Sequence, residues 1–310
     1  MKAIETVDIR KDYAGEKALK GVSLSADEGI IFGIIGADGA GKTTLMRICA
    51  TLINADKGNA RIFGFDTATQ FREIRNIIGY MPQRFSLYQD LSVRENLLFF
   101  ADVFGVKKKE RRERMDRLLR FSRLDEFQKR RAANLSGGMK QKLALSCALI
   151  HTPKLLLLDE PTTGVDPVSR KEFWDILKEL RAQGITILIT TPYMDEATLC
   201  DSLLLIHKGE TVIQGTPSEL LKEYPCDLYK LSSDTGSVYT PQNTPRPGGV
   251  FMMYPLGGTL HIAVEKNMPV DILSSKMKAV VPEGNRMNRI EPSIEDLFFF
   301  TLSQKETETR

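Results

Sequence analysis

The chain has few of the residues that build metal or disulfide sites. Its 310 residues include 3 histidines and 4 cysteines, and the cysteines lie far apart with no C-x-x-C pair. A structural zinc site needs a cluster of such ligands at short spacings, so this class of site is not expected. The cysteine pattern also does not indicate a disulfide framework, and it favours a reduced, cytosolic compartment.

The sequence also lacks a long apolar run and a strong charge of either sign. No apolar segment approaches the ~18 residues that a membrane-spanning helix needs, and the start "MKAIETVDIRKDYAG" has no apolar core of a signal peptide. Hydrophobic residues make up 42%, charged residues 27%, and the net charge is +3. These values are typical of a soluble globular protein. If the protein works at a membrane, other chains supply the membrane part.

Apolar periodicity predicts an α/β domain in the larger part of the chain. Residues 1–35 alternate apolar and polar side chains, which indicates short strands with turns at Gly15 and Gly29. The runs "GIIFGII", "KLLLLD" and "ITILIT" predict buried strands, separated by segments with helical spacing. Ser92, with Glu95 shortly after it, predicts a helix start. Such alternation of strands and helices favours a parallel sheet.

The composition changes after about Tyr224. The segment "SSDTGSVYTPQNTPRPGG" is rich in loop-forming residues. Around it, "DLYKLS", "VFMMYP" and "TLHIAVE" predict short strands, and "PVDILSSKMKAVV" predicts a helix. We therefore expect two domains, residues 1–224 and a small α+β domain over residues 225–310.

The segment 107–131 is basic, with 12 Lys or Arg and 5 Asp or Glu. Its spacing predicts a helix with a solvated face and with an inward face made by Met115, Leu118, Leu119 and Phe127. Contact with anionic lipid head groups is the alternative interpretation of this charge.

A glycine-rich loop matches G-x-x-x-x-G-K-[ST] between a predicted strand and a predicted helix. Glycines let backbone N–H groups surround phosphate oxygens, and the helix N-terminus adds partial positive charge. In this motif Lys42 reaches the β- and γ-phosphates, and the Thr43 hydroxyl binds Mg²⁺. The sequence therefore predicts a nucleotide site that consists of Gly36, Ala37, Asp38, Gly39, Ala40, Gly41, Lys42, Thr43 and Thr44.

Two carboxylates follow the apolar run "LLLLD". Asp159 ends this strand, where it can hold Mg²⁺ through water, and Glu160 comes directly after it. A carboxylate one residue beyond a metal ligand is placed to polarise an attacking water. Beside the glycine-rich loop, this pair predicts nucleotide hydrolysis with Glu160 as the catalytic residue.

The sequence "LSGGMKQKLALSCAL" resembles the signature of ABC-type ATPases. Ser136, Gly137 and Gly138 match the family pattern LSGGQ, and Met139 replaces the glutamine. In that family the signature loop completes the nucleotide site of a second subunit, where its hydroxyl and helix N-terminus face the γ-phosphate. The resemblance therefore implies that Ser136 to Gly138 bind the nucleotide of a partner subunit.

The resemblance covers roughly residues 1–224 and implies the fold. It implies a P-loop (RecA-like) ABC ATPase core with a small antiparallel β part and a helical subdomain at about residues 84–150. The small α+β domain follows. ATP and Mg²⁺ are the implied cofactors.

The resemblance also implies roles for single residues. Tyr13 resembles the aromatic residue that stacks on adenine, and Gln83 resembles the glutamine that senses Mg²⁺ and the attacking water. Residues after Gln83, including Tyr88, would form part of a groove for a coupling helix of the membrane subunit. "TTGVDP" resembles the loop whose Asp166 crosses to the partner subunit.

Two segments, "ITTPYMDEA" and "RIEPSIEDLFFF", resemble ATPases of drug and antibiotic exporters that drive ABC-2 type membrane subunits. In that group a small C-terminal domain ends in a P-S-x-E-D-hydrophobic motif. The implied partners are membrane permease subunits and a second ATPase subunit, with no nucleic acid. The implied location is the cytoplasmic face of the inner or plasma membrane, as a peripheral protein.

Pro192 is the main departure from the family pattern T-T-H-Y-M-D-E-A, in which a histidine contacts the γ-phosphate and holds the water. Proline has no side-chain donor and no backbone N–H, and losing such a group often costs about 10² to 10⁴ in rate. The sequence predicts a site that binds MgATP and hydrolyses it slowly, in a dimer with a different ATPase. Asp38 and Met139 are smaller departures from the pattern.

Other interpretations stay open at this point. The chain could be a regulatory nucleotide-binding subunit without turnover, or a fully active homodimeric ATPase in which another group replaces the histidine. An ABC protein of ribosomes or DNA is less favoured, since those usually join two ATPase units in one chain.

Overall fold

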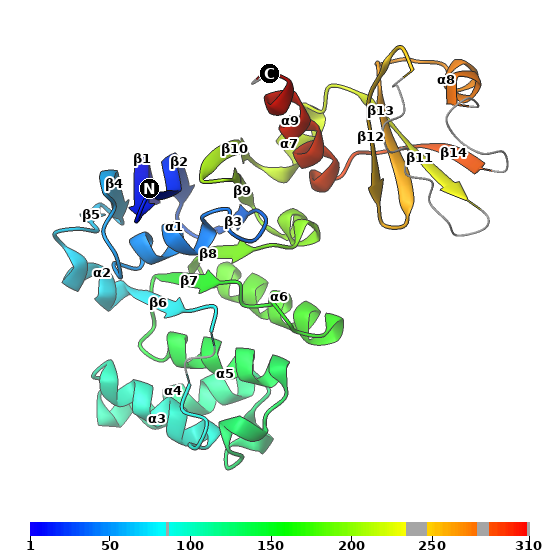
Figure 1. The fold of residues 1–310 in the computed structure, drawn as a ribbon. Helices are drawn as coiled ribbons and strands as arrows, with labels where there is room; N and C mark the ends of the chain where they lie inside the picture. The colour runs from blue at the N-terminus through cyan, green and yellow to red at the C-terminus, as the bar shows by residue number, and fades with distance from the viewer. Residues whose placement is uncertain (85–86, 234–246, 278–284, 309–310) are drawn as a thin grey trace. The chain divides into compact units, whose positions relative to one another are not determined.

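The protein is described by a computed structural model that covers residues 1–84, 87–233, 247–277 and 285–308. The chain divides into two compact units, Met1–Pro217 and Ser218–Arg310 (Figure 1). The domain boundary expected at Tyr224 falls inside the second unit. Among the described residues, no helix combines the length and the apolar character that crossing a bilayer requires.

An antiparallel sheet opens the first unit. Its strands are β1 (Lys2–Tyr13), β2 (Glu16–Asp27), β4 (Lys57–Ile62) and β5 (Phe65–Asp66), in the order β2-β1-β4-β5. The turn between β1 and β2 contains Gly15 with φ of 97°, a conformation that glycine adopts without steric cost. This sheet is the small antiparallel part that the family resemblance implied.

The central sheet has six strands in the order β10-β9-β3-β8-β7-β6. Neighbouring strands from β9 to β6 pair in parallel, and β10 pairs antiparallel with β9. The predicted parallel sheet is therefore confirmed. Its strands are β3 (Ile31–Ile35), β6 (Ile78–Met81), β7 (Leu155–Asp159), β8 (Thr186–Thr191), β9 (Ser202–His207) and β10 (Glu210–Gly215).

Helices cover both faces of the central sheet (Figure 1). Leu155 and Leu157 of β7 pack into a core with α1 (Lys42–Cys49) and α2 (Phe71–Ile77). Leu156 and Leu158 of the same strand pack into a second core with α5 and α6. Because side chains alternate along a strand, one apolar run supplies both cores. The bounds of the last two helices are α5 (Gly137–Leu149) and α6 (Pro167–Ala182).

The helical subdomain begins at a capping box. The Ser92 hydroxyl accepts from the Glu95 N–H at 3.3 Å, and the Glu95 carboxylate accepts from the Ser92 N–H at 2.7 Å. The helix start predicted at Ser92 is thus confirmed. The subdomain consists of α3 (Val93–Val103), α4 (Lys108–Phe121), η1 (Asp125–Phe127), η2 (Ala132–Asn134) and α5.

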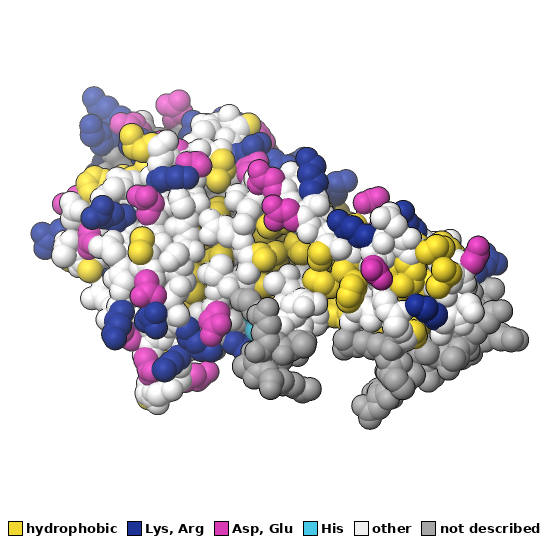
Figure 2. All heavy atoms as spheres, turned by 90° about the horizontal axis from the view of Figure 1, so that it is seen from above, with side chains coloured by type: hydrophobic (Ala, Val, Ile, Leu, Met, Phe, Trp, Pro, Cys, Tyr) yellow, Lys and Arg dark blue, Asp and Glu magenta, His cyan; other side chains and the backbone are white. Residues whose placement is uncertain are grey.

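The basic segment after α3 turns its apolar face inward. Met115, Leu118 and Leu119 of α4 are buried, and Phe127 is partly buried against the same core. The predicted amphipathic helix is confirmed over Lys108–Phe121, whereas Phe127 lies in the separate 3₁₀ helix η1. On the face shown in Figure 2, Lys and Arg side chains are interspersed with Asp and Glu, in keeping with the small net charge.

The second unit contains a four-stranded antiparallel sheet in the order β12-β13-β11-β14. The three strands predicted after Tyr224 are present, and the predicted helix begins at Val270, with its last part outside the described residues, as is most of the predicted loop. The elements are α7 (Pro217–Lys222), β11 (Asp227–Ser233), β12 (Val250–Leu256), β13 (Thr259–Val264), α8 (Val270–Met277), β14 (Asn285–Ile290) and α9 (Ile294–Glu308).

The motif "PSIED" joins α9 to this sheet through Asp296, whose side chain is 1% exposed. One carboxylate oxygen accepts from the N–H (2.7 Å) and hydroxyl (2.5 Å) of Ser293, which precedes α9. The other accepts from the Tyr254 hydroxyl (2.5 Å) and from His261 Nδ1 (2.6 Å) on β12 and β13. Burial raises the pKa of Asp296, but these hydrogen bonds outweigh burial and lower the pKa below its usual value.

Candidate nucleotide-binding site

The register of the central sheet brings three predicted elements to one edge. Ile35 at the end of β3 pairs with Thr191, and Asp159 at the end of β7 pairs with Thr190. The glycine-rich loop, Pro192 and Glu160 therefore follow three adjacent parallel strands. The carboxyl edge of such a sheet is where α/β proteins bind ligands.

The glycine-rich loop requires its glycines because other backbone approaches it closely. A Cβ at Gly36 would lie 2.3 Å from the carbonyl oxygen of Ile206, and a Cβ at Gly41 would lie 2.6 Å from that of Ala18. Gly41 also has φ of 105°, which disfavours other residues. The loop is therefore packed against β9 and β2 just before α1 begins at Lys42.

Lys42 lies at the centre of the loop and is only 3% exposed. Its ammonium donates to the carbonyl oxygens of Gly36 (2.8 Å) and Ala37 (3.1 Å). It also forms an ion pair with Glu160 at 3.0 Å, while Asp38 lies at 4.0 Å with a side chain that is 91% exposed. A phosphate that enters this loop has to compete with the Glu160 carboxylate for Lys42.

Glu160 adopts a left-handed backbone conformation with φ of 51°. Its N–H donates to the carbonyl oxygen (3.1 Å) and hydroxyl (2.9 Å) of Thr190 on β8. Its carboxylate accepts from Gln83 Nε2 at 2.8 Å. A strained backbone of this kind persists when the surrounding contacts determine it, and such residues cluster at functional sites. The structure thus places both predicted catalytic residues, Glu160 and Gln83, in direct contact.

Asp159 is a buried carboxylate with one satisfied oxygen. Its Oδ1 accepts from the hydroxyls of Thr43 (3.0 Å) and Thr190 (2.8 Å). Within the described part of the chain, its Oδ2 has no hydrogen-bond partner. Burial raises the pKa of Asp159, and the hydrogen bonds from the two threonines oppose this effect. A buried, unpaired carboxylate oxygen beside a threonine hydroxyl fits a bound cation.

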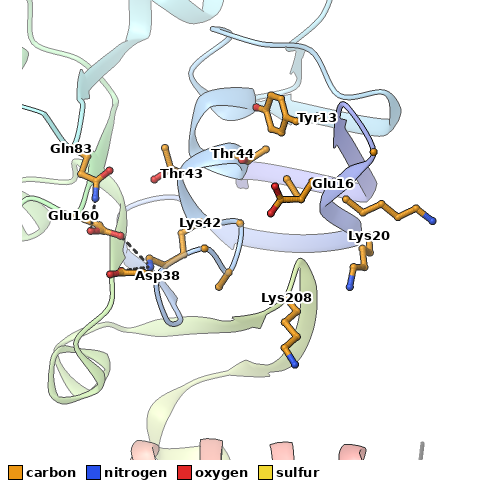
Figure 3. A pocket seen from close by; sticks show the side chains of 16 residues that line it. Tyr13, Glu16, Lys20, Asp38, Lys42, Thr43, Thr44, Gln83, Glu160 and Lys208 are labelled. Carbon is orange, nitrogen blue, oxygen red and sulfur yellow. Dashed lines mark hydrogen bonds and ion pairs between the residues drawn. The ribbon is translucent and has the colours of Figure 1, made fainter.

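A cavity of about 770 Å³ opens beside the glycine-rich loop (Figure 3). Of the predicted site, the lining includes Tyr13, Asp38, Gly39, Ala40, Gly41, Lys42, Thr43, Thr44, Gln83 and Glu160. Gly36, Ala37 and Asp159 are absent from this lining and reach the site through their contacts with Lys42 and Thr43.

Six residues of the lining were not predicted from the sequence: Gly15, Glu16, Lys17, Ala18, Lys20 and Lys208. They come from the β1–β2 hairpin, β2 itself and the turn between β9 and β10. No local motif marks them, because the pairing of distant strands is what brings them to the glycine-rich loop.

The signature residues lie elsewhere in the first unit. Ser136 accepts from the Met139 N–H at 3.3 Å as the N-cap of α5, and a Cβ at Gly138 would lie 2.5 Å from Ser169. Ser136, Gly137 and Gly138 are not part of the cavity lining. Nearby, Asp166 caps α6 by accepting from the Ser169 N–H at 2.9 Å.

The chain around Pro192 is held on both sides. The Thr191 hydroxyl accepts from the Tyr193 N–H at 3.0 Å, and the Arg170 guanidinium lies 4.1 Å from the Tyr193 ring centre. The 3₁₀ helix η3 (Met194–Leu199) follows, and its buried Glu196 accepts from the Thr162 hydroxyl at 2.8 Å. This turn is therefore formed without an N–H or a side-chain donor at residue 192.

Known proteins resemble the chain over this region. Residues 19–163 match the family model for the ABC transporter domain. The chain is 49% identical over 192 residues to a probable multidrug ABC transporter ATP-binding protein, YbhF, of Escherichia coli, covering 62% of the chain but 33% of the relative. It is 39% identical to the Nod factor export ATP-binding protein I of Paraburkholderia xenovorans, covering 74% of the chain and 76% of the relative.

Solved structures agree with these relatives. The structure of cbiO1 of Clostridium perfringens, part of the ABC transporter complex cbiONQ, matches with a TM-score of 0.66 at 28% identity, over 72% of the chain and 91% of cbiO1. The ATP-binding cassette MJ0796, in a dimeric post-hydrolysis state with ADP and Pi, matches with a TM-score of 0.62 at 28% identity, over 69% and 98%. The predicted P-loop fold is confirmed, and the chain belongs to the ATP-binding proteins of the ABC transporter family.

Proposed function

We propose that the chain is the ATP-hydrolysing motor subunit of an exporter that carries small molecules, and that its own nucleotide site turns over slowly. The names of the relatives support export, since they refer to multidrug and Nod factor transport. The chain spans about a third of the length of YbhF, so the partners of the whole assembly are part of the proposal. They are membrane permease subunits and a second ATPase subunit, which would hold the chain at the cytoplasmic face of the membrane.

ATP binding begins with an exchange of partners at Lys42. The phosphate chain enters the glycine-rich loop, where the backbone N–H groups and the N-terminus of α1 face it. In this structure the Lys42 ammonium forms an ion pair with Glu160 at 3.0 Å. The phosphate oxygens replace Glu160 as the partner of this ammonium. Tyr13, which is 44% exposed at the other end of the cavity, offers its ring to the base. Binding therefore releases the Glu160 carboxylate from its ion pair.

Mg²⁺ fits beside Asp159 and Thr43. The Asp159 oxygen that has no partner in the described chain, together with the Thr43 hydroxyl 3.0 Å from the other oxygen, supplies the hard oxygen ligands that this ion prefers. When bound, Mg²⁺ neutralises charge on the phosphates. Thr190 fixes the carboxylate by donating at 2.8 Å, so the ligand is oriented before the ion arrives.

Glu160 and Gln83 then act on the attacking water. Released from Lys42, the Glu160 carboxylate keeps its hydrogen bond from Gln83 at 2.8 Å and can accept a proton from the water. Gln83 follows β6 on an exposed stretch, so its position depends on what contacts that stretch. This link supports a route by which a permease helix near Tyr88, which is 50% exposed, affects hydrolysis.

Pro192 is the observation that carries the proposal of slow turnover. The residue lies directly after β8, between the glycine-rich loop and Glu160 in the order of the sheet. Proline offers no hydrogen-bond donor to a developing phosphate charge. Loss of one such positioned donor typically costs about 10² to 10³ in rate. ATP would therefore bind with Mg²⁺ and remain for longer than in a site with a histidine here.

The separation of Ser136 to Gly138 from the cavity supports a composite site across two subunits. These residues form the N-terminus of α5, which would face the nucleotide of a second ATPase. We propose that this second ATPase is a different chain that carries the histidine. Its nucleotide would be hydrolysed against Ser136 to Gly138, while the ATP held by Lys42 keeps the two subunits together.

The test compares ATP turnover of the purified chain with that of its Pro192→His variant, at a concentration high enough for dimers. Because the turn at Tyr193 is closed by Thr191, the variant is expected to fold. We expect a nearly silent parent and a variant restored towards ~1 s⁻¹, the low end of ordinary enzymes. Pro269→His, an exposed proline before α8, is the matched control and should stay silent.

Equal and substantial turnover in the parent and the Pro192→His variant would overturn the slow-site proposal and favour an active homodimer. Turnover that persists after Glu160→Gln would show that a contaminating ATPase is being measured. Purification of the working complex with two copies of this chain and no second ATPase would remove the proposed pairing.

A further inference from the structure

Lys208 occupies a turn position that does not suit lysine. Strands β9 and β10 are joined by Lys208 and Gly209, with His207 paired to Glu210. Both turn residues have positive φ, 47° for Lys208 and 79° for Gly209. A two-residue turn of this kind favours Asn-Gly, Asp-Gly or Gly-Gly because a longer side chain is strained in the first position. Lys208 shares this strained first position with Ala14 and Phe63 in two other X-Gly turns of the chain, so its place beside the nucleotide site is what distinguishes it.

This turn is attached to the nucleotide site. The Gly209 N–H donates to the carbonyl oxygen of Ala40 in the glycine-rich loop at 2.9 Å, and the Lys20 N–H donates to the carbonyl oxygen of Gly209 at 2.8 Å. A Cβ at Gly209 would lie 2.7 Å from the Ala18 carbonyl oxygen. One hydrogen bond therefore fixes the turn to the glycine-rich loop, and the other fixes it to β2.

Few of the residues with a strained backbone conformation line the cavity. Nine described residues other than glycine have φ between 47° and 65°. Of these nine, only Glu160 and Lys208 line the cavity, and Glu160 is the candidate catalytic residue. Lys208 belongs to the lining of the cavity, and Figure 3 shows it on the β9–β10 hairpin with its ammonium directed away from Lys42. Strain at a ligand-binding rim indicates a functional constraint more strongly than strain at an ordinary surface turn.

The charged side chains that line the cavity also bear on the role of Lys208. Four lysines (Lys17, Lys20, Lys42 and Lys208) and three acids (Glu16, Asp38 and Glu160) line the cavity. Lys42 pairs with Glu160 and Lys20 pairs with Glu210, whereas the ion pairs of the described chain include none for Lys208. Without Lys208 the lining would carry no net charge, and the exposed Asp38 would repel a polyphosphate. Lys208, like Lys17, therefore contributes a positive charge to the lining that no ion pair of the described chain neutralises.

We infer that Lys208 is a further nucleotide-binding residue, whose ammonium contacts the phosphate chain of ATP from the solvent side of the cavity. The inference rests on the proposed function, since it assumes that the nucleotide lies in this cavity. The long side chain of lysine can turn from the rim towards the phosphates, while the hairpin keeps its Cα in place. Lys208 would add to the affinity for phosphate and would offset the acid at Asp38.

The test measures affinities for ATP, ADP and adenosine by displacement of a fluorescent ATP analogue from the full chain. Lys208→Asn removes the cation but suits the turn. It should weaken ATP binding about two- to fivefold, the effect of one partly exposed ion pair, and leave adenosine binding unchanged. The same variant should raise the melting temperature by about 1–3 °C, because asparagine tolerates positive φ.

Two further variants serve as controls. Lys208→Arg keeps the charge and should bind ATP within about twofold of the parent. Lys178→Gln removes an exposed lysine on α6, outside the cavity, and should leave ATP affinity unchanged. Higher salt should narrow the difference between the parent and Lys208→Asn, because salt screens an exposed charge.

ATP affinity in Lys208→Asn that equals the parent value would overturn the inference, as would an equal loss of adenosine affinity. The rise in melting temperature shows that the variant is folded, so either result counts. If the parent fails to bind ATP, or binds it equally well after Lys42→Ala, the proposed function itself fails. If ATP binding depends on Lys42 and not on Lys208, only the assignment of Lys208 fails.

Discussion

Replacement of Asp296 by asparagine should unfold the second unit at a much lower temperature. The carboxylate accepts four hydrogen bonds from Ser293, Tyr254 and His261 while it is 1% exposed. Asparagine has the same shape but only one acceptor oxygen. Its NH₂ group would therefore face the hydrogen-bond donors on one side of the residue. The change leaves buried donors without an acceptor between α9 and the sheet.

The expected loss is about 3 kcal/mol, the upper range for leaving buried hydrogen-bond donors without their charged acceptor. For a unit the size of Ser218–Arg310, this corresponds to a fall in melting temperature of at least about 12 °C. Scanning calorimetry of the full chain measures the loss. Trp174, the single tryptophan, lies in the first unit, so its fluorescence shows whether that unit remains folded.

Asp271→Asn is the matched control, because Asp271 is an exposed acid in the first turn of α8 and the same substitution there should cost little.

The pH dependence of unfolding provides a second test. The pKa of Asp296 is lowered in the folded chain, so its stabilisation is present at neutral pH and is lost as the pH falls below about 4, the value for an ordinary aspartate. The difference between parent and Asp296→Asn should therefore shrink in acid. Equal unfolding of Asp296→Asn and the control at pH 7 would refute this account.

Two predictions concern the nucleotide site. Lys42→Ala should abolish measurable ATP binding. It should also lower the melting temperature, because it leaves the buried Glu160 without its cation. The double variant with Glu160→Gln should regain much of the melting temperature but no ATP binding. Asp159→Asn should remove the Mg²⁺-dependent part of ATP affinity yet not lower the melting temperature of the nucleotide-free chain. Burial raises the pKa of Asp159, so its charged form costs stability at neutral pH. A drop of several degrees in Asp159→Asn without ligand would contradict this reasoning.

The sequence could predict the parts of the fold and site that depend on local pattern. Apolar runs such as "LLLLD" predict buried strands because one run supplies two cores, as Leu155 to Leu158 do. The glycine-rich loop was predictable because phosphate binding requires glycines, a lysine and a hydroxyl in a continuous segment. Ser92 could be assigned as a helix start because a capping box spans only one turn.

The features of the fold and the site that the sequence could not predict depend on contacts between distant segments. The pairing of Lys42 with Glu160, the hydrogen bond from Thr190 to Asp159 and the position of Lys208 all arise from the order of β3, β8, β7 and β9 in the sheet. A single sequence contains no local signal for that order. The six additional residues of the cavity lining were missed for this reason, since each comes from a strand or turn whose neighbours are set by the whole fold.

The motif "PSIED" shows how a family resemblance acquires a physical cause. From the sequence it indicated only a group of exporters, whereas the structure gives Ser293 and Asp296 a physical role. Ser293 and Asp296 form reciprocal hydrogen bonds at the start of α9, since the Asp296 N–H also donates to the Ser293 hydroxyl at 3.2 Å. The remaining oxygen of Asp296 holds β12 and β13. The motif therefore fixes a helix to a sheet, which argues that its requirement is stability of the second unit rather than nucleotide chemistry.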